Sequence, residues 1–152
     1  MGGPRACYAG SMTAPAMTAD DIDRFLAVEF PQARGWTRIA AIRHDELDLE
    51  LPFSADNLRP GGTLSGPTLM TLADTAMFYL LLSRLGPVAL AVTTSLAINF
   101  LRRPPPAALL ATARLLKLGT RLAVGEVHIR SGEGGVLVAQ ASVTYALPPA
   151  RA

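Results

Sequence analysis

The feature that most constrains this chain is one long, almost wholly apolar segment with turn signals at both ends. Residues 66–85 carry hydrophobic side chains around the full circumference of a helix, and their only acid is Asp74. Ser65 or Gly66 can cap the helix, Pro67 suits its first turn, and a Gly-Pro pair ends it. The segment therefore predicts a buried helix that the rest of the chain wraps on nearly every side.

A membrane span is the first alternative for this helix. Its uninterrupted apolar run, residues 77–82, is far shorter than the roughly 20 residues that a bilayer requires. Asp74 and three threonines precede that run. We therefore expect a buried helix in a globular domain and no membrane partner.

The composition limits the class of protein. Half of the 152 residues are hydrophobic, which predicts one domain with a substantial core. A formal net charge of only +2 argues against a nucleic-acid partner. The single cysteine, Cys7, excludes a disulfide framework and fits a reducing cytoplasm. Residues 1–17 are rich in small residues and proline, so we expect a disordered tail there and a single domain over residues 18–147.

Extended segments flank the apolar helix on both sides. An amphipathic helix is predicted within residues 18–33, closed by Pro31, and a hairpin follows at residues 36–43 and 46–51. Further extended segments are predicted at residues 89–101, 108–118, 122–130 and 136–146. We expect an α+β fold in which a five-stranded antiparallel sheet curls around the long helix.

Asp74 is the strongest candidate for chemistry. The sequence has no P-loop or dinucleotide pattern, no HExxH, no Cys/His cluster and no GxSxG. An ionised carboxylate on an apolar helix is expensive to bury unless it has partners or a task. The alternative is a structural acid that Thr71, Thr75 or a backbone group satisfies.

The loop before the helix adds a recognisable spacing. Residues 62–67 read Gly-Thr-Leu-Ser-Gly-Pro, Asp74 lies nine positions after Ser65, and residues 94–102 read Thr-Ser-Leu-Ala-Ile-Asn-Phe-Leu-Arg. This arrangement resembles the PaaI-like (phenylacetate-degradation type) acyl-CoA thioesterases, which have the hotdog fold. In that family a Gly-Thr-x-His-Gly-Gly stretch enters the helix, and an acid follows the histidine by nine positions. The resemblance covers roughly residues 35–147.

The resemblance implies hydrolysis of acyl-CoA thioesters. It makes Asp74 the general base or nucleophile and the Gly66 N–H the donor to the thioester carbonyl oxygen. The supporting residues that it implies are Asn57, Arg59, Ser65 and Thr94. It implies no metal or redox cofactor, and CoA enters only as part of the substrate. Because the nine residues up to Asp74 span about 13 Å, one helix cannot supply both groups, and the family places the site at the interface of a homodimer or homotetramer.

Arginines near strand ends are candidates for the CoA phosphates. Arg102, Arg103 and Arg121 could form a basic rim, because guanidinium groups bind phosphate in a bidentate manner.

The chain also departs from the family pattern. Ser65 replaces the histidine, Pro67 replaces the second glycine and removes an N–H, and Asn57 lies eight rather than six positions before Ser65. Arg59 occupies the position expected for the asparagine. These departures favour the alternative, a non-catalytic acyl-CoA-binding or scaffold module. A hotdog hydratase or dehydratase would need a catalytic histidine, and no histidine lies near this helix in the sequence.

Overall fold

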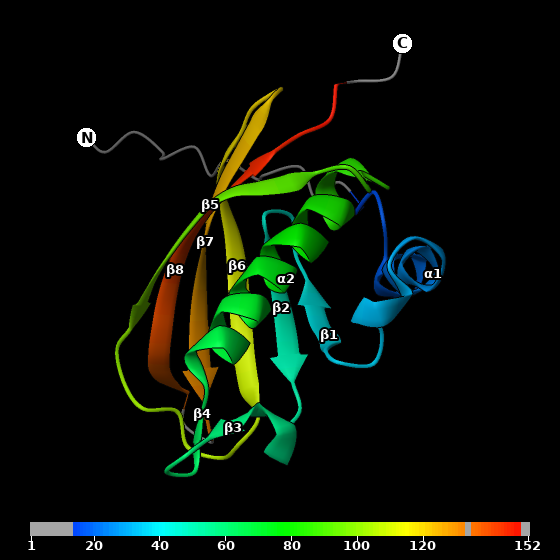
Figure 1. Cartoon of the computed structure of the whole chain (residues 1–152). Coiled ribbons are helices and arrows are strands. Elements are labelled where there is room, and N and C mark those ends of the chain that lie inside the picture. Colours follow the sequence, from blue (N-terminus) through cyan, green and yellow to red (C-terminus); the bar gives the residue numbers. More distant parts are fainter. Residues whose placement is uncertain (1–13, 133–134, 150–152) are drawn as a thin grey trace, which may run out of the picture.

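The computed structural model describes residues 14–132 and 135–149. Its centre is α2 (Gly66–Leu85), which lies against one face of a curved antiparallel sheet (Figure 1). The predicted bounds of this helix are confirmed. Ser65 is its N-cap, because the Ser65 Oγ accepts a hydrogen bond of 3.3 Å from the Thr68 N–H. Gly86 ends the helix with a φ of 91°, a value that favours glycine.

The sheet contains six strands, in the order β1-β2-β6-β7-β8-β5, and all neighbours are antiparallel. The strands are β1 (Arg38–Ile42), β2 (Glu46–Leu51), β5 (Val92–Phe100), β6 (Leu109–Leu118), β7 (Leu122–Ser131) and β8 (Val136–Ala146). The expected number of five is wrong. Every extended segment seen in the sequence joins the sheet, including the short outer strand β1, which pairs with β2 over its whole length.

Two short segments complete the fold. The loop before α2 contains a 3₁₀ turn (Ala55–Asn57) and a two-residue ladder between β3 (Leu58–Arg59) and β4 (Thr63–Leu64). Helix α1 (Ala19–Glu29) begins at a capping box between Thr18 and Asp21 and ends before a 3₁₀ turn at Pro31–Ala33.

The packed region begins before residue 18. The Ala16 N–H donates to the Ser83 carbonyl oxygen at 2.7 Å, and the Met17 side chain is buried. Residues 14–17 were expected in the tail. The rest of that expected tail, residues 1–13, lies outside the described residues.

Close contact between α2 and the sheet forms the core. Leu69, Leu72, Met77 and Leu80 of the helix are fully buried against the sheet. The closest approach is at Gly125 of β7, where a Cβ atom would lie 2.6 Å from Met77 Sδ and 2.8 Å from the Arg114 carbonyl oxygen. Only glycine fits at this position without displacing a neighbour.

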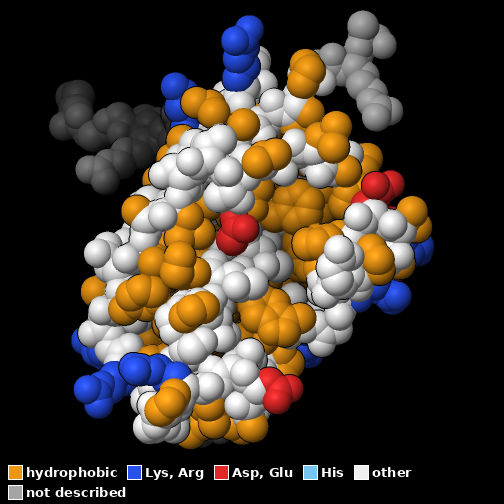
Figure 2. Space-filling model, viewed as in Figure 1, with side chains coloured by type: hydrophobic (Ala, Val, Ile, Leu, Met, Phe, Trp, Pro, Cys, Tyr) orange, Lys and Arg blue, Asp and Glu red, His pale blue; other side chains and the backbone are white. Residues whose placement is uncertain are grey.

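One side of α2 and one edge of the sheet are left uncovered by the residues that the structure describes. Pro67, Met70 and Thr71 are exposed on α2, so the expected wrapping on nearly every side is incomplete, because a single sheet covers only one face of a helix. In the described part of the chain strand β5 pairs only with β8, and both its ends are exposed, with Val92 58% and Phe100 51% exposed. The surface seen from the helix side carries many hydrophobic side chains (Figure 2). No helix within the described residues has the length and apolar character needed to cross a membrane.

Candidate active site

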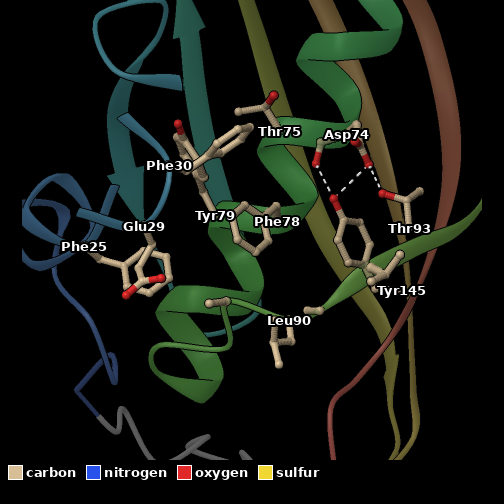
Figure 3. A pocket seen from close by; sticks show the side chains of 13 residues that line it. Phe25, Glu29, Phe30, Asp74, Thr75, Phe78, Tyr79, Leu90, Thr93 and Tyr145 are labelled. Atoms are coloured by element: carbon tan, nitrogen blue, oxygen red, sulfur yellow. Dashed lines mark hydrogen bonds between the residues drawn. The ribbon is translucent and has the colours of Figure 1, made fainter. Parts of the chain in front are cut away.

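Asp74 projects from the middle of α2 towards a cavity of about 480 Å³ between α1, α2 and the strands β5 and β8 (Figure 3). Most of the lining is apolar or aromatic and comes from both helices and from the loop before β5. The main contributors are Phe25, Phe30, Phe78, Tyr79 and Leu90. Such a cavity can hold an apolar group next to a carboxylate.

Two hydroxyl groups hold the Asp74 carboxylate. Thr93 Oγ1 of β5 donates to Asp74 Oδ1 at 2.7 Å, and Tyr145 Oη of β8 donates to the same oxygen at 2.8 Å. Thr71 and Thr75, the partners considered from the sequence, instead donate to helix carbonyl oxygens at 3.0 and 2.7 Å. Among the described residues no cation forms an ion pair with Asp74.

The threonine beside Asp74 is Thr93, one residue before the predicted Thr94. The β5–β8 register shifts between Thr93 and Ser95, so Thr94 is an additional residue in the ladder. Thr94 is exposed and donates to the Thr144 carbonyl oxygen at 3.3 Å. Strand alternation alone cannot locate such a bulge.

Sequence reasoning also missed Tyr145. It lies opposite Thr93 in the β5–β8 ladder, and the side chains of this cross-strand pair both reach Asp74. Burial raises the pKa of the Tyr145 phenol, and the neighbouring Asp74 charge raises it further. Burial also raises the pKa of Tyr79 in the same cavity.

Gly66 lies in a different cavity, of about 380 Å³, at the start of α2. The Gly66 N–H has no acceptor among the described residues, and the Phe100 ring lies 3.4 Å from where a Gly66 Cβ would be. Arg59, Arg102 and Arg103 line this cavity. A free N–H at the positive end of a helix, with cations nearby, can stabilise a developing oxyanion.

The remaining predicted residues are divided between the two ends of the sheet. The Asn57 carbonyl oxygen accepts from the Ser65 N–H at 2.9 Å, next to Gly66. Arg102 donates to the Leu137 carbonyl oxygen at 2.7 Å. Arg121 lies in the turn before β7, near the end of β8, and therefore far along the sheet from Arg102. Within one chain the three proposed arginines do not form one rim.

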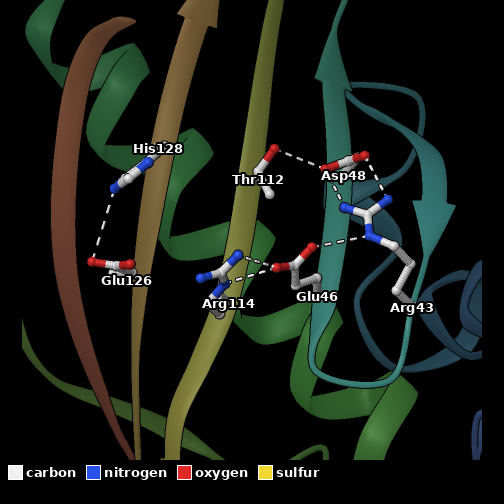
Figure 4. A network of polar contacts seen from close by, with 7 residues as sticks. All are labelled: Arg43, Glu46, Asp48, Thr112, Arg114, Glu126 and His128. Carbon is white, nitrogen blue, oxygen red and sulfur yellow. Dashed lines mark hydrogen bonds and ion pairs between the residues drawn. The ribbon is translucent and has the colours of Figure 1, made fainter. Parts of the chain in front are cut away.

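A second polar cluster covers the face of the sheet that points away from α2 (Figure 4). Arg43 makes a bidentate pair with Asp48 at 2.9 and 3.0 Å, and Arg114 donates to Glu46 at 2.7 Å. Hydrogen bonding from Arg114 lowers the pKa of Glu46. Burial alone would raise the pKa of Asp48, but hydrogen bonds from Arg43 and Thr112 outweigh it and lower the value. The carboxylates of Glu46 and Asp48 are thus neutralised.

These features define a class: an α+β protein of the hotdog type, with a carboxylate on its central helix. Residues 61–144 match the thioesterase superfamily, and the chain belongs to that superfamily. The sequence resemblance is thereby confirmed at the level of the family, and family membership supports thioester hydrolysis. No curated protein matches the chain.

Solved structures agree with this family. A protein from Silicibacter sp. TM1040, assigned as a thioesterase, is 37% identical with a TM-score of 0.80, over 92% of this chain and 97% of that one. A Ralstonia eutropha JMP134 protein, assigned as a thioesterase and related to phenylacetic acid degradation, is 26% identical with a TM-score of 0.67, over 72% and 83%. A Haemophilus influenzae thioesterase with 21% identity and a TM-score of 0.75, over 88% and 92%, shares the fold.

Proposed function

We propose that this protein hydrolyses acyl-CoA thioesters at a site shared by two protomers. Asp74 is the general base or nucleophile. The Gly66 N–H of the other protomer donates a hydrogen bond to the oxyanion that forms at the thioester carbonyl. The observation that carries the proposal is the environment of Asp74. It is an acid at an apolar cavity, held by two neutral hydroxyls and neutralised by no cation among the described residues, so it keeps its charge for chemistry.

The open edge of β5 supports a shared site. Thr93, which contacts Asp74, lies at one end of β5, and Phe100, which contacts Gly66, lies at the other. If β5 pairs in an antiparallel manner with its own copy about its middle, each end lies beside the opposite end of the partner strand. The Asp74 cavity of one protomer then adjoins the Gly66 cavity of the other. Such a pairing would also cover the exposed stripe of α2.

The chemistry follows from these two groups. Asp74 takes a proton from water as the hydroxide adds to the thioester carbonyl carbon, and the carbonyl oxygen becomes negative beside the Gly66 N–H. Collapse of this intermediate breaks the carbon–sulfur bond, and the leaving thiolate takes the proton that Asp74 accepted from water. Direct attack by the carboxylate would instead expel the CoA thiolate and form a mixed anhydride. Water then hydrolyses the anhydride to the free acid and the regenerated Asp74 carboxylate, and the thiolate takes up the released proton. Incorporation of labelled oxygen from water into Asp74 during a single turnover would identify direct attack.

The two cavities suit the two halves of the substrate. The aromatic lining beside Asp74 fits an apolar acyl group, whereas Arg59, Arg102 and Arg103 beside Gly66 fit the phosphates of CoA. In the antiparallel pair, Arg121 of one protomer lies at the same end as Arg102 of the other. The dimer would thus bring together the arginines that one chain keeps apart.

The test is thiol release from a panel of acyl-CoAs by the wild type and by Asp74→Asn. Asparagine has nearly the same shape but cannot act as base or nucleophile, so kcat should fall by at least about 10²-fold with KM little changed. The matched control is Asp48→Asn, the same substitution in the outer cluster, which should keep wild-type kcat. Light scattering should give a dimer or a larger assembly for all three proteins.

Three outcomes would each overturn part of the proposal. Full activity in correctly folded Asp74→Asn would remove this residue from the mechanism. Saturable acyl-CoA binding by the wild type without any turnover would favour the binding-module alternative, for which the substitutions at Ser65 and Pro67 are the argument. An active monomer would refute the shared site while leaving hydrolysis intact.

A further inference from the structure

Two donors converge on one oxygen of the Asp74 carboxylate. Thr93 Oγ1 and Tyr145 Oη both bond Oδ1, and Tyr145 Oη also lies 3.2 Å from the Asp74 carbonyl oxygen. Oδ2 receives no hydrogen bond from any described residue. The two oxygens of this carboxylate therefore differ: one is fixed to the sheet and the other is left for a ligand (Figure 3).

The Tyr145 side chain is itself held firmly. It is 3% exposed, and its ring stacks on Phe78, one turn along α2 from Asp74, with 6.2 Å between centroids and an interplanar angle of 10°. A buried phenol needs an acceptor, and Asp74 supplies it. Because burial raises the pKa of Tyr145, the hydroxyl keeps its proton at physiological pH and acts as a donor to the carboxylate.

We propose that Tyr145 is a positioning residue for hydrolysis: by occupying Oδ1 it fixes the carboxylate rotamer and presents Oδ2 to the attacking water or thioester. The proposal rests on the function proposed for Asp74. Thr93 assists from the opposite strand, but Tyr145 is the better anchor, because its ring is rigid and its hydroxyl contacts both the side chain and the backbone of Asp74.

The proposal makes a prediction for kinetics. Without Tyr145 the carboxylate can rotate and its reactive oxygen is no longer aligned, which affects the chemical step more than substrate binding. Tyr145→Phe keeps the ring and its stacking on Phe78 but removes the hydroxyl. We expect kcat to fall about tenfold to a hundredfold, as for the loss of a hydrogen bond to a charged group, with KM little changed.

A second readout separates positioning from a structural role. Because Tyr145→Phe keeps the ring and its stacking on Phe78, KM and the equilibrium affinity for a non-hydrolysable acyl-CoA analogue should stay near the wild-type values while kcat falls. The matched control is Thr112→Val, which removes a hydroxyl donor to the Asp48 carboxylate on the outer face of the sheet and should leave kcat unchanged. Both variants should unfold cooperatively near the wild-type temperature.

The experiments distinguish failure of the positioning role of Tyr145 from failure of the proposed hydrolysis at Asp74. If Asp74→Asn is inactive while Tyr145→Phe has wild-type kcat, the positioning role is refuted and the proposed function stands. A raised KM with unchanged kcat in Tyr145→Phe would mean that Tyr145 contacts the acyl group instead, which also refutes it. If Asp74→Asn remains active, the proposed function itself fails.

Discussion

Asp74 and Asp48 both accept hydrogen bonds from two side chains, but the donors differ in charge. One donor to Asp48 is a guanidinium cation, whereas both donors to Asp74 are neutral hydroxyls. Asp48, on the outer face of the sheet, faces the Arg43 guanidinium in a bidentate pair and also accepts from Thr112 at 2.8 Å. The Asp74 carboxylate, on the inner side, accepts only from the hydroxyls of Thr93 and Tyr145 among residues 14–132 and 135–149. Both carboxylates are fixed in place, but only the first has its charge neutralised.

The difference indicates how a structural acid can be told from a reactive one. A carboxylate that a cation neutralises contributes to stability and is a poor base, whereas neutral donors orient a carboxylate and leave its charge available. The contrast makes three predictions, in order of decreasing effect.

The first prediction gives Asp74 the cation that it lacks. Thr71 is exposed on α2 within one chain, three residues before Asp74, so the ammonium in Thr71→Lys can reach the carboxylate. Because the proposed dimer would cover this side of α2, light scattering has to show the wild-type assembly in each variant before the kcat values are compared. The ammonium would compete for Oδ2 with water, and kcat should fall about tenfold or more. Steady-state thiol release measures the effect. Thr71→Gln, similar in length but neutral, is the control, and equal losses in both variants would show that size rather than charge is responsible.

The second prediction compares how the same substitution at the two acids changes the free energy of unfolding. Asp48→Asn breaks the bidentate pair and should reduce the free energy of unfolding by about 1 kcal/mol, a modest value because Arg43 is 45% exposed in this pair. Asp74→Asn should be neutral or stabilising, because its amide oxygen can still accept from both hydroxyls and a costly charge is removed. Urea unfolding measures both values. A larger loss of stability in Asp74→Asn than in Asp48→Asn would make Asp74 a structural acid.

The third prediction concerns pH and has the smallest effect. Asp48 and Glu46 have lowered pKa values in the folded state. Their contribution to the free energy of unfolding is therefore present above about pH 4, and it is lost as pH falls through the pKa values of the folded state. Tyr145 has a raised pKa, so its contribution is present below about pH 10 and is lost as pH rises further.

Urea unfolding across the pH range tests this contrast. The acid-side loss should shrink in Asp48→Asn, and the alkaline loss should shrink in Tyr145→Phe. An unchanged slope on the corresponding side of either profile would contradict the assignment.

Much of the fold could be predicted because local patterns determine it. The bounds of α2 follow from Ser65 and Gly86, and β2 follows from its strict alternation of apolar and acidic residues. The number of strands was underestimated, although every extended segment was recognised. The open stripe of α2 was also missed, because apolar residues all round a helix indicate burial without saying whether the same chain provides it.

The candidate site was harder to predict than the fold. Asp74 and Gly66 could be proposed from the sequence, because a lone acid on an apolar helix follows a glycine-containing loop at the spacing of the family motif. Thr93 and Tyr145 could not, because their approach to Asp74 depends on the register of β5 against β8 and on the bulge at Thr94. The sequence shows which residues lie on a strand, but a bulge alters which of them face inward.

Gly125 has a consequence that reaches beyond its own strand. A side chain there would collide with Met77 and with the backbone at Arg114, so the helix would have to rise from the sheet. Asp74 lies one turn before Met77 on the same helix, whereas its two hydroxyl partners are anchored in the sheet. The lack of a side chain at Gly125 thus keeps α2 close to the sheet and sets the distance from the Asp74 carboxylate to the hydroxyls of Thr93 and Tyr145. Random mutagenesis screened for lost activity in still-folded protein should therefore recover variants at this buried position, which touches neither cavity.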